Sequence, residues 1–336
     1  MSGRGSIPAA LLVAVHLSAL GADFLAAYSP NEQNRTMPYA PPSRARFVDA
    51  EGRPHLRPFV YRLVEASAGG YEEDRSRAYP IRFLVRDAPS GFPRRTARLH
   101  LFGVDEPARV FLLGTDGFGR DQLSRLLHGA RISLFAGLLA TAVSLAVGCV
   151  LGTLAGFYGR WIDAALMRGA ELFLALPWLY LLFAVRASLP LHVSAAQAFL
   201  LLVLVIGLVD WARSARLVRG VVLSARERNY VLAARGFGAS DFYLIRRHIA
   251  PQTFSLLLTQ ATLLVPQYIL AEVTLSFLGL GVSEPEPSVG NMLSALQHYD
   301  VLASYWWMWI PGLALVPVFL AYFALSDALQ SRVALP

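Results

Sequence analysis

A glycine-rich stretch of the sequence, residues 113–121, brings three charged residues close together. Asp116, Arg120 and Asp121 could bind a metal ion or a phosphate group if a turn gathered their side chains. Aspartate is also favoured at the start of a helix, where its carboxylate accepts hydrogen bonds from free backbone N–H groups. We therefore interpret the stretch as a structural cap that leads into a helix at residues 122–127, and we expect no metal there.

The rest of the sequence offers few residues for covalent or metal chemistry. All thirty cationic residues are arginine, so there is no lysine for a nucleotide-binding P-loop or a Schiff base. Cys149 is the only cysteine and lies in an apolar run, which excludes a disulfide framework and a cysteine-based metal site. The histidines show no HExxH or other paired ligand spacing. We expect no catalytic residue, no cofactor and no metal in this chain.

Some ionisable residues lie inside or beside apolar segments, where a charge costs about 2.5–3.5 kcal/mol on insertion scales and must face protein or water. Glu272 is the clearest case, because it lies deep in an apolar run just after Pro266, where we expect a kink. Glu171, Arg186 and Asp210 border other apolar runs. Glu272 could line a polar pathway through a membrane, or it could form a contact between helices that fixes their packing. We favour the second interpretation.

An arginine-rich segment, residues 213–251, carries eight arginines between two apolar runs. We expect two helices in it, one at residues 216–235 and a second that begins after Ser240 or Asp241 and ends at Pro251. The segment could dock in a groove of a partner protein, or it could be a basic loop that binds anionic lipid head groups. Between the two helices, small residues offer a surface for close approach and a flexible turn: Ala233, Ala234, Gly236, Gly238 and Ala239.

The composition indicates an integral membrane protein. Of the 336 residues, 55% are hydrophobic and 16% are charged, and a soluble domain is nearer about a quarter charged. Apolar runs of about 20 residues, enough to cross the hydrocarbon core, predict six transmembrane helices. The first run could instead be a cleaved signal peptide, but its length favours a retained anchor. The predicted spans are residues 7–27, 132–157, 164–185, 195–212, 255–280 and 306–325.

Charge in the short loops predicts the orientation of these spans. The loops at residues 157–168 and 213–251 carry arginine, and the loops at residues 189–195 and 282–305 carry none. The arginine-bearing loops should therefore face the cytoplasm, and with six spans both termini lie there too. Because the net charge of +7 is explained by this topology, we expect membrane lipid and not nucleic acid around the chain.

The polar segment between the first two spans, residues 28–131, lies outside the cytoplasm in this topology. Its many arginines do not contradict the topology, because loops longer than about 60 residues escape the charge rule. Its early part, residues 29–57, is rich in Pro, Arg and Asn and should be irregular. Short strands are predicted at residues 59–64, 81–85, 99–104 and 110–113. The chain thus divides into an anchor (1–28), a small β-containing extracytoplasmic insertion (29–112) and a transmembrane domain (113–336).

Five motifs occur in the order in which they stand in the inner-membrane permeases of bacterial ABC importers. They are LGTDGFGRDQLSRLLHGARISL (113–134), GFYGRWIDAALMR (156–168), YVLAARGFGASD (230–241), RRHIAPQ (246–252) and LSFLGLGVSEPEPSVGNML (275–293). The chain most closely resembles the second permease of dipeptide, oligopeptide and nickel systems. This resemblance covers residues 113–327 and the single span before them. It implies an all-α polytopic membrane fold of about six helices, of the MetI-like type.

By this resemblance, residues 230–241 form the loop that docks in the cleft of a cytoplasmic ATPase subunit. Two positions depart from the family pattern: Leu232 stands where the family usually has glutamate, and Ala250 stands where leucine usually precedes the proline. Arg228 or Arg235 would then supply the charged contact. The implied docking residues are Tyr230, Ala233, Ala234, Arg235, Gly238, Ala239, Ser240 and Asp241. The glycine-rich stretch matches a structural motif of the family, with Gly114, Asp116, Gly119, Arg120, Asp121 and Arg131.

The resemblance implies a permease subunit of an ATP-driven importer, forming half of a translocation pathway in the bacterial inner membrane. A second, related permease, two ATPase subunits and an extracytoplasmic solute-binding protein would complete the importer. The cargo would be di- or oligopeptides, with nickel, opines or another small solute as alternatives. The 29–112 insertion could be part of a dock for the binding protein, or a spacer.

Two other classes of protein fit the sequence less well. A membrane-embedded protease would need Ser/His, paired Asp or HExxH on the spans, and the sequence lacks them. A self-sufficient secondary transporter or channel would predict inverted repeats and more charge inside the spans, which we do not find.

Overall fold

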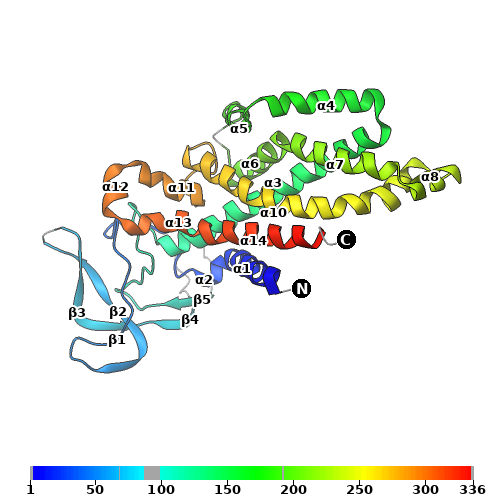
Figure 1. The fold of residues 1–336 in the computed structure, drawn as a ribbon. Coiled ribbons are helices and arrows are strands. Elements are labelled where there is room, and N and C mark those ends of the chain that lie inside the picture. The colour runs from blue at the N-terminus through cyan, green and yellow to red at the C-terminus, as the bar shows by residue number, and fades with distance from the viewer. Residues whose placement is uncertain (1–2, 68, 87–98, 191–192, 334–336) are drawn as a thin grey trace. The chain divides into compact units, whose positions relative to one another are not determined.

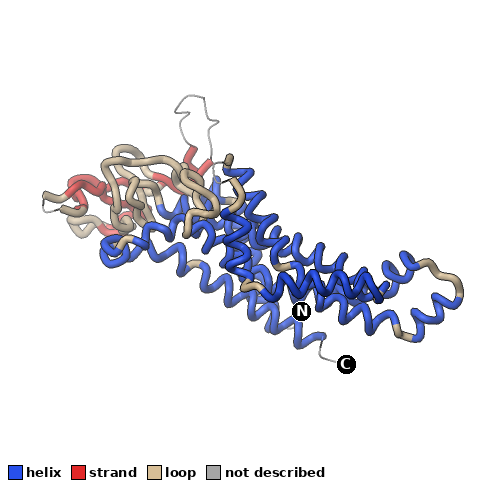
Figure 2. Tube along the Cα trace, turned by 90° about the horizontal axis from the view of Figure 1, so that it is seen from above, coloured by secondary structure: helices blue, strands red, loops and turns tan. Residues whose placement is uncertain are grey.

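The computed structural model describes residues 3–67, 69–86, 99–190 and 193–333. The chain forms two compact units, each assembled from segments far apart in the sequence (Figure 1). The helical unit comprises Met1–Leu12, Ser133–Gly281 and Pro317–Pro336, and the sheet unit comprises Val13–Ile132 and Val282–Val316. The strands of the described residues all lie in the sheet unit, and helices dominate the rest of the chain (Figure 2).

Apolar helices build the helical unit. Its core contains the completely buried side chains of Leu182, Leu202 and Tyr268, and it packs α3, α5, α6 and α10 against one another. The helices are α1 (Gly3–Leu20), α3 (Gln122–Tyr158), α4 (Arg160–Ala175), α5 (Trp178–Ala187), α6 (Ala195–Val209), α7 (Trp211–Arg226), α10 (Ala250–Phe277) and α14 (Leu315–Val333). Of these, α1, α3 and α14 also contribute residues to the sheet unit.

Three glycines of α3 make a close contact with α7. Gly148, Gly152 and Gly156 recur every four residues and therefore lie on one face of the helix. A Cβ atom at Gly148 would come within 2.6 Å of Ser214 Cβ, and one at Gly156 within 2.8 Å of Val222 Cβ, while one at Gly152 would overlap the α7 backbone. Small residues of this kind let two helix backbones touch in a membrane. We call this contact the glycine seam.

Three helical stretches are long and apolar enough to cross a membrane: Gln122–Tyr158, Asp241–Phe277 and Trp306–Ser331. They contain most of the second, fifth and sixth predicted spans. Two further candidates are pairs of helices, α4 with α5 and α6 with α7, which are bent by 89° and 46° respectively. The apolar part of α1, Gly5–Leu20, is shorter. The described residues thus hold three spans, or up to five if each bent pair is one span, compared with the six predicted.

Neither the third nor the fourth predicted span is a continuous helix. α4 ends at Ala175 because Pro177 follows: the residue before a proline is driven out of the helical region, and Leu176 has ψ 140°. Asp210, with φ −105° and ψ 16°, separates α6 from α7. The predicted first span is likewise divided at Gly21, between α1 and the short helix α2 (Ala22–Leu25).

Pro251 does not end a helix, contrary to the prediction. It is the second residue of α10, which continues directly from α9 (Asp241–Leu244) and a π-turn at Ile245–Ile249. Proline is tolerated in the first turn of a helix, and the wider π-turn before it accommodates the missing N–H. The helix is continuous through Pro266.

The sheet unit contains two small antiparallel sheets. Strands β1 (Arg46–Val48), β2 (Pro54–Glu65) and β3 (Tyr71–Pro80) form one in the order β1-β2-β3, and β4 (Arg82–Arg86) pairs with β5 (Leu99–Gly103) in the other. Their core is built from Val60, Tyr79 and Phe102, among other buried residues. Short helices complete the unit: α11 (Val289–Leu293), η2 (Ser294–Gln297), α12 (Tyr299–Ser304), η3 (Trp306–Trp309) and α13 (Ile310–Leu313).

The strand predictions are right in part. Residues 59–64 lie in β2, and residues 81–85 and 99–104 overlap β4 and β5. Residues 110–113 are not a strand: the Phe111 N–H and carbonyl bond to Ser43, so the segment is held by a neighbouring loop. β1 lies in the region expected to be irregular. β3 was missed because its polar sequence lacks an apolar alternation; its pairing with β2 makes it a strand.

Candidate functional site

The arginine-rich segment begins within α7 and runs to the start of α10 of the helical unit (Figure 1). The predicted helix at residues 216–235 is in fact two helices, α7 and α8 (Asn229–Gly236), because Arg228 has an extended backbone with ψ 138°. A tertiary contact fixes the end of α7: Arg226 Nη1 donates to the carbonyl oxygen of Gly156 at 2.9 Å. Local sequence contains no signal for this contact.

A Schellman motif ends α8. The Gly238 N–H donates to the Arg235 carbonyl at 3.0 Å, and the Ala239 N–H donates to the Ala234 carbonyl at 3.1 Å. Gly238 has φ +85°, which glycine adopts without strain. Ser240 then caps α9 by accepting a hydrogen bond from the Tyr243 N–H at 3.3 Å. Residues 229–241, the α8 segment, therefore have a fixed backbone.

One side of the α8 segment is buried in the helical unit. Val231 is completely buried in a cluster with Val222 of α7, Leu244 of α9 and Phe157 of α3, and Ala234 and Ala239 pack against it. The cluster therefore holds the segment against the ends of the long helices.

The other side of the α8 segment faces outward. Phe237 is 93% exposed and Phe242 is 72% exposed. Ala233 and Gly236 are also exposed, and a Cβ atom added at Gly236 would meet no atom within 4 Å. Arg235 pairs with Asp241 at 3.8 Å. The result is an exposed face with small residues at its centre and aromatic rings beside them.

The glycine-rich stretch of the sheet unit is the centre of a charged cluster. Asp116 Oδ2 accepts from Arg120 Nε at 2.6 Å, and Arg120 and Arg125 both donate to the carboxylate of Glu284, at 2.6 and 2.8 Å. Burial lowers the pKa of Arg120, but Glu284 and Asp116 outweigh it, so its pKa lies above the ordinary value. Arg125 and Glu284 were not among the predicted site residues. They are 159 residues apart in sequence, so no local pattern links them.

Other residues of the stretch have structural contacts. Asp121 accepts from the Ser124 N–H at 2.8 Å and from the Ser124 hydroxyl at 2.5 Å, at the start of α3. Burial raises the pKa of Asp121 to about 6. A Cβ atom at Gly114 would lie 2.7 Å from the Ala40 carbonyl oxygen, and one at Gly119 would overlap the backbone of a neighbouring loop. Arg131 donates to Asp23 at 3.0 Å.

The ionisable residues of the apolar segments are buried to different extents. Glu272 is completely buried and accepts a hydrogen bond from Ser276, one turn along α10, at 2.6 Å. Arg186 is 1% exposed, and its Nη1 donates to the Pro190 carbonyl. Asp210 is also buried, at the junction of α6 and α7, and Glu171 is exposed. Among the described residues no group of three or more His, Cys, Asp or Glu could hold a metal ion.

Comparisons with known proteins agree on one family. The model of a family described as binding-protein-dependent transport system inner membrane component matches residues 148–335. A protein of Brucella suis biovar 1, provisionally named a peptide permease, is 36% identical over 253 residues, which are 75% of this chain and 82% of that protein. The dipeptide transport system permease protein DppC of Bacillus subtilis is 36% identical over 225 residues, 67% of this chain and 68% of that protein.

One solved structure among the matches is an inward-facing form of the MetNI methionine ABC transporter. Its alignment has a TM-score of 0.44 at 17% identity and covers 61% of this chain and 95% of that chain.

Proposed function

The chain belongs to the family of binding-protein-dependent transport system inner membrane components, and we propose on that basis that it is a permease subunit of an ATP-driven importer. The exposed face of the α8 segment is the observation that carries this proposal. It combines a fixed backbone, small central residues and exposed aromatic rings, which suit insertion into the groove of another protein.

The α8 segment is the proposed docking site for an ATPase subunit. Val231 packs the segment against Val222 of α7 and Phe157 of α3. This contact suits the role, because a movement of the segment would act directly on those two helices. Leu232 stands where a glutamate is expected, and we propose that Arg228 or Arg235 supplies the charged contact to the partner instead. ATP is hydrolysed in the partner, and this chain carries out no covalent step.

The orientation and partners follow from the same proposal. The arginines of residues 213–251 favour the cytoplasmic side for the α8 segment, and we propose that both termini lie on that side as well. The importer then contains a second permease, two ATPase subunits and a solute-binding protein on the opposite side of the membrane. Peptides are the proposed cargo, because the relatives from Brucella suis and Bacillus subtilis carry peptide and dipeptide transport names.

The docking proposal is tested by Gly236→Arg, with Gly220→Arg as the matched control. Neither glycine has an atom within 4 Å of an added Cβ or a positive φ, so both variants should fold. Gly236 lies on the exposed face of α8, and Gly220 lies on the exposed side of α7. The chain is co-expressed with its ATPase subunits. Co-purification and solute-stimulated ATP hydrolysis are then measured in proteoliposomes.

We expect Gly236→Arg to reduce ATPase co-purification and stimulated hydrolysis at least ten-fold, because the arginine side chain fills the space that a partner groove needs. Gly220→Arg should retain both. Equal behaviour of the two variants would reject the α8 segment as the docking site.

A further inference from the structure

The charged cluster of the sheet unit borders a cavity of about 380 Å³. Arg120, Arg125 and Glu284 line it, together with Gln122, Asn291 and His298. Volumes of about 300–1,000 Å³ are typical of sites for small molecules, which are mostly apolar with a few fixed polar groups. Hydrogen bonds hold Arg120, Arg125 and Glu284 together beside the cavity, so it is suited to a small polar solute.

Two buried arginines provide the strongest recognition element of this cavity. Arg120 and Arg125 are 5% and 1% exposed, and three of their N–H groups converge on Glu284 at 2.6, 3.3 and 2.8 Å. Paired guanidinium groups in this arrangement recognise a planar carboxylate.

The two carboxylates that balance these arginines are held differently. Asp116 is buried, and its Oδ1 also accepts from the backbone N–H groups of Phe118 and Arg120, at 2.9 and 3.0 Å. It is therefore a fixed part of the turn. The side chain of Glu284 is 46% exposed. Its carboxylate is the group that an external carboxylate could replace, because it can return to water without breaking a turn.

The amide of Gln122 is a second polar group beside the cavity, and its Nε2 donates to the sulfur of Met308. Gln122 is 2% exposed, and among the described residues its Oε1 has no hydrogen-bond donor. A buried acceptor without a donor destabilises the folded chain, because it has lost its hydrogen bonds to water. A solute that supplies an N–H group would remove this cost. A complementary solute would therefore place an anionic group at Arg120 and Arg125 and a hydrogen-bond donor at Gln122.

We propose that this cavity is a binding site for a small solute with a free carboxylate and a hydrogen-bond donor, of the size and chemistry of an amino acid or a dipeptide. The solute carboxylate binds Arg120 and Arg125 in place of Glu284, and its donor reaches Gln122. The site itself is inferred from this geometry alone. Only its link to the transported cargo rests on the proposed function.

The net charge of the cluster leads to a specific prediction for the variant Glu284→Gln. Two arginines and two carboxylates give the cluster a net charge of zero, and the substitution leaves two arginines and Asp116, a net charge of +1. It also removes the internal competitor for the arginines. The variant should therefore bind a carboxylate more tightly than the wild-type chain.

The test uses the purified full-length chain in detergent, with alanyl-alanine as the probe and alanyl-alanine amide as the matched ligand without a carboxylate. Isothermal titration calorimetry should give at least ten-fold tighter binding of the acid to Glu284→Gln than to the wild type. Glu286→Gln, two residues along the same loop, should bind like the wild type. Arg125→Gln added to Glu284→Gln should abolish the gain.

Two results would overturn the proposal: equal binding of the acid and the amide, or no gain in Glu284→Gln. The wild-type chain offers a second measurement that needs no variant. At millimolar concentration the acid should raise the melting temperature and the amide should not. These tests contain no ATPase, so they can fail while the Gly236→Arg test succeeds, and the reverse also holds.

Discussion

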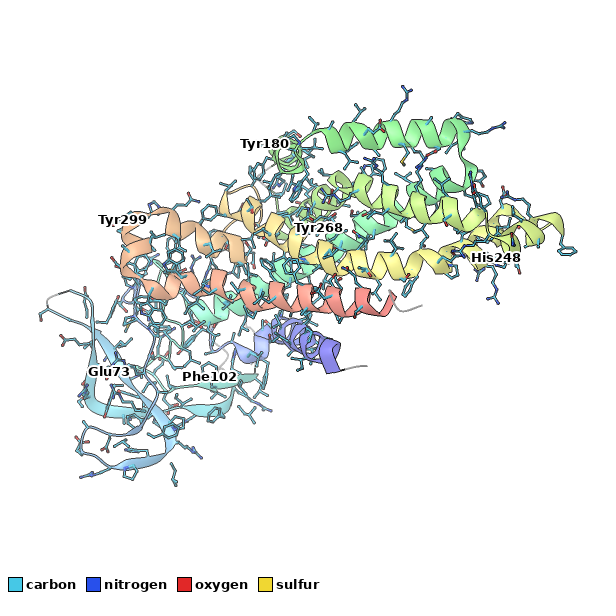
Figure 3. All side chains as sticks on the ribbon, viewed as in Figure 1. Glu73, Phe102, Tyr180, His248, Tyr268 and Tyr299 are labelled. Carbon is cyan, nitrogen blue, oxygen red and sulfur yellow. The ribbon has the colours of Figure 1, made fainter. Side chains whose placement is uncertain are left out.

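The hydroxyl of Tyr268, a residue of α10 (Figure 3), donates to Oδ2 of Asp210 over 3.1 Å, at the point where α6 ends and α7 begins. Ser144 Oγ of α3 lies 2.9 Å from the same hydroxyl. One buried polar contact therefore joins α10 and α3 to the bend that leads to the α8 segment.

Tyr268→Phe should weaken this junction. The substitution leaves the buried carboxylate of Asp210 without its tyrosine donor, which should lower the free energy of unfolding by about 1–3 kcal/mol. Thermal unfolding in detergent measures the change. Tyr180→Phe serves as the control, because Tyr180 is 74% exposed and loses only a solvated hydroxyl. Equal melting temperatures for both variants would contradict a stabilising role for the contact.

Gly238→Ala and Gly236→Ala should have opposite effects on α8. Gly238 has φ +85°, so alanine there is strained by about 1 kcal/mol. Gly236 is the last residue of α8 and lies in open space, where alanine is favoured over glycine by up to about 1 kcal/mol. Hydrogen exchange over residues 229–239 should become faster in the first variant and slower in the second. The same direction of change in both would contradict the Schellman geometry.

Gly152→Leu should disrupt the glycine seam. A leucine side chain has no space against the α7 backbone, so α3 and α7 must separate. We expect a loss of about 3 kcal/mol or more, or failure to accumulate in the membrane. Gly169→Leu on α4, where an added Cβ meets no atom within 4 Å, should accumulate normally. Normal accumulation and melting of Gly152→Leu would show that the helices do not touch there.

Asp121 should make the stability of the chain depend on pH. Because burial raises its pKa from an ordinary value near 4 to about 6, the folded chain binds this proton more tightly than the unfolded chain. The stabilisation that this bound proton provides is fully present below about pH 4 and is lost as the pH rises through 6. The free energy of unfolding falls by at most about 3 kcal/mol over this range. Asp121→Asn keeps an oxygen for the cap and removes the charge. Its stability relative to the wild type should therefore increase between pH 4 and pH 7.

The cap at Asp121 can be separated from its charge. Asp121→Ala removes the acceptor for the Ser124 N–H as well as the charge, so it should be less stable than Asp121→Asn by about 1 kcal/mol at every pH. A parallel pH dependence of the wild type and Asp121→Asn would contradict the raised pKa.

The parts of the fold that depend on local composition can be predicted from the sequence. The long apolar stretches are visible because a membrane span needs about 20 apolar residues, and the cap at Ser240 follows from residue type. The bend after Ala175 could have been found from Pro177. The break at Asp210 could not, because its partner Tyr268 lies 58 residues away in sequence.

The charged cluster is a second case in which contacts between residues far apart in the sequence could not be predicted. The glycine-rich stretch is conspicuous, and its aspartates suggest a cap. The pairing of Arg120 and Arg125 with Glu284 joins residues more than 150 positions apart and arises only when the chain folds. Sequence reasoning therefore finds half of the cluster.

The glycine seam has a mechanical consequence. Side chains that lie between two helices can change rotamer, and they can thereby accommodate a small displacement of one helix relative to the other. At the glycine seam no side chain of α3 lies between the two backbones, so there is no rotamer change that could absorb a shift. We therefore expect α3 and α7 to tilt as one unit. A displacement of the α8 segment, which packs against both helices through Val231, should then move α3 and α7 together.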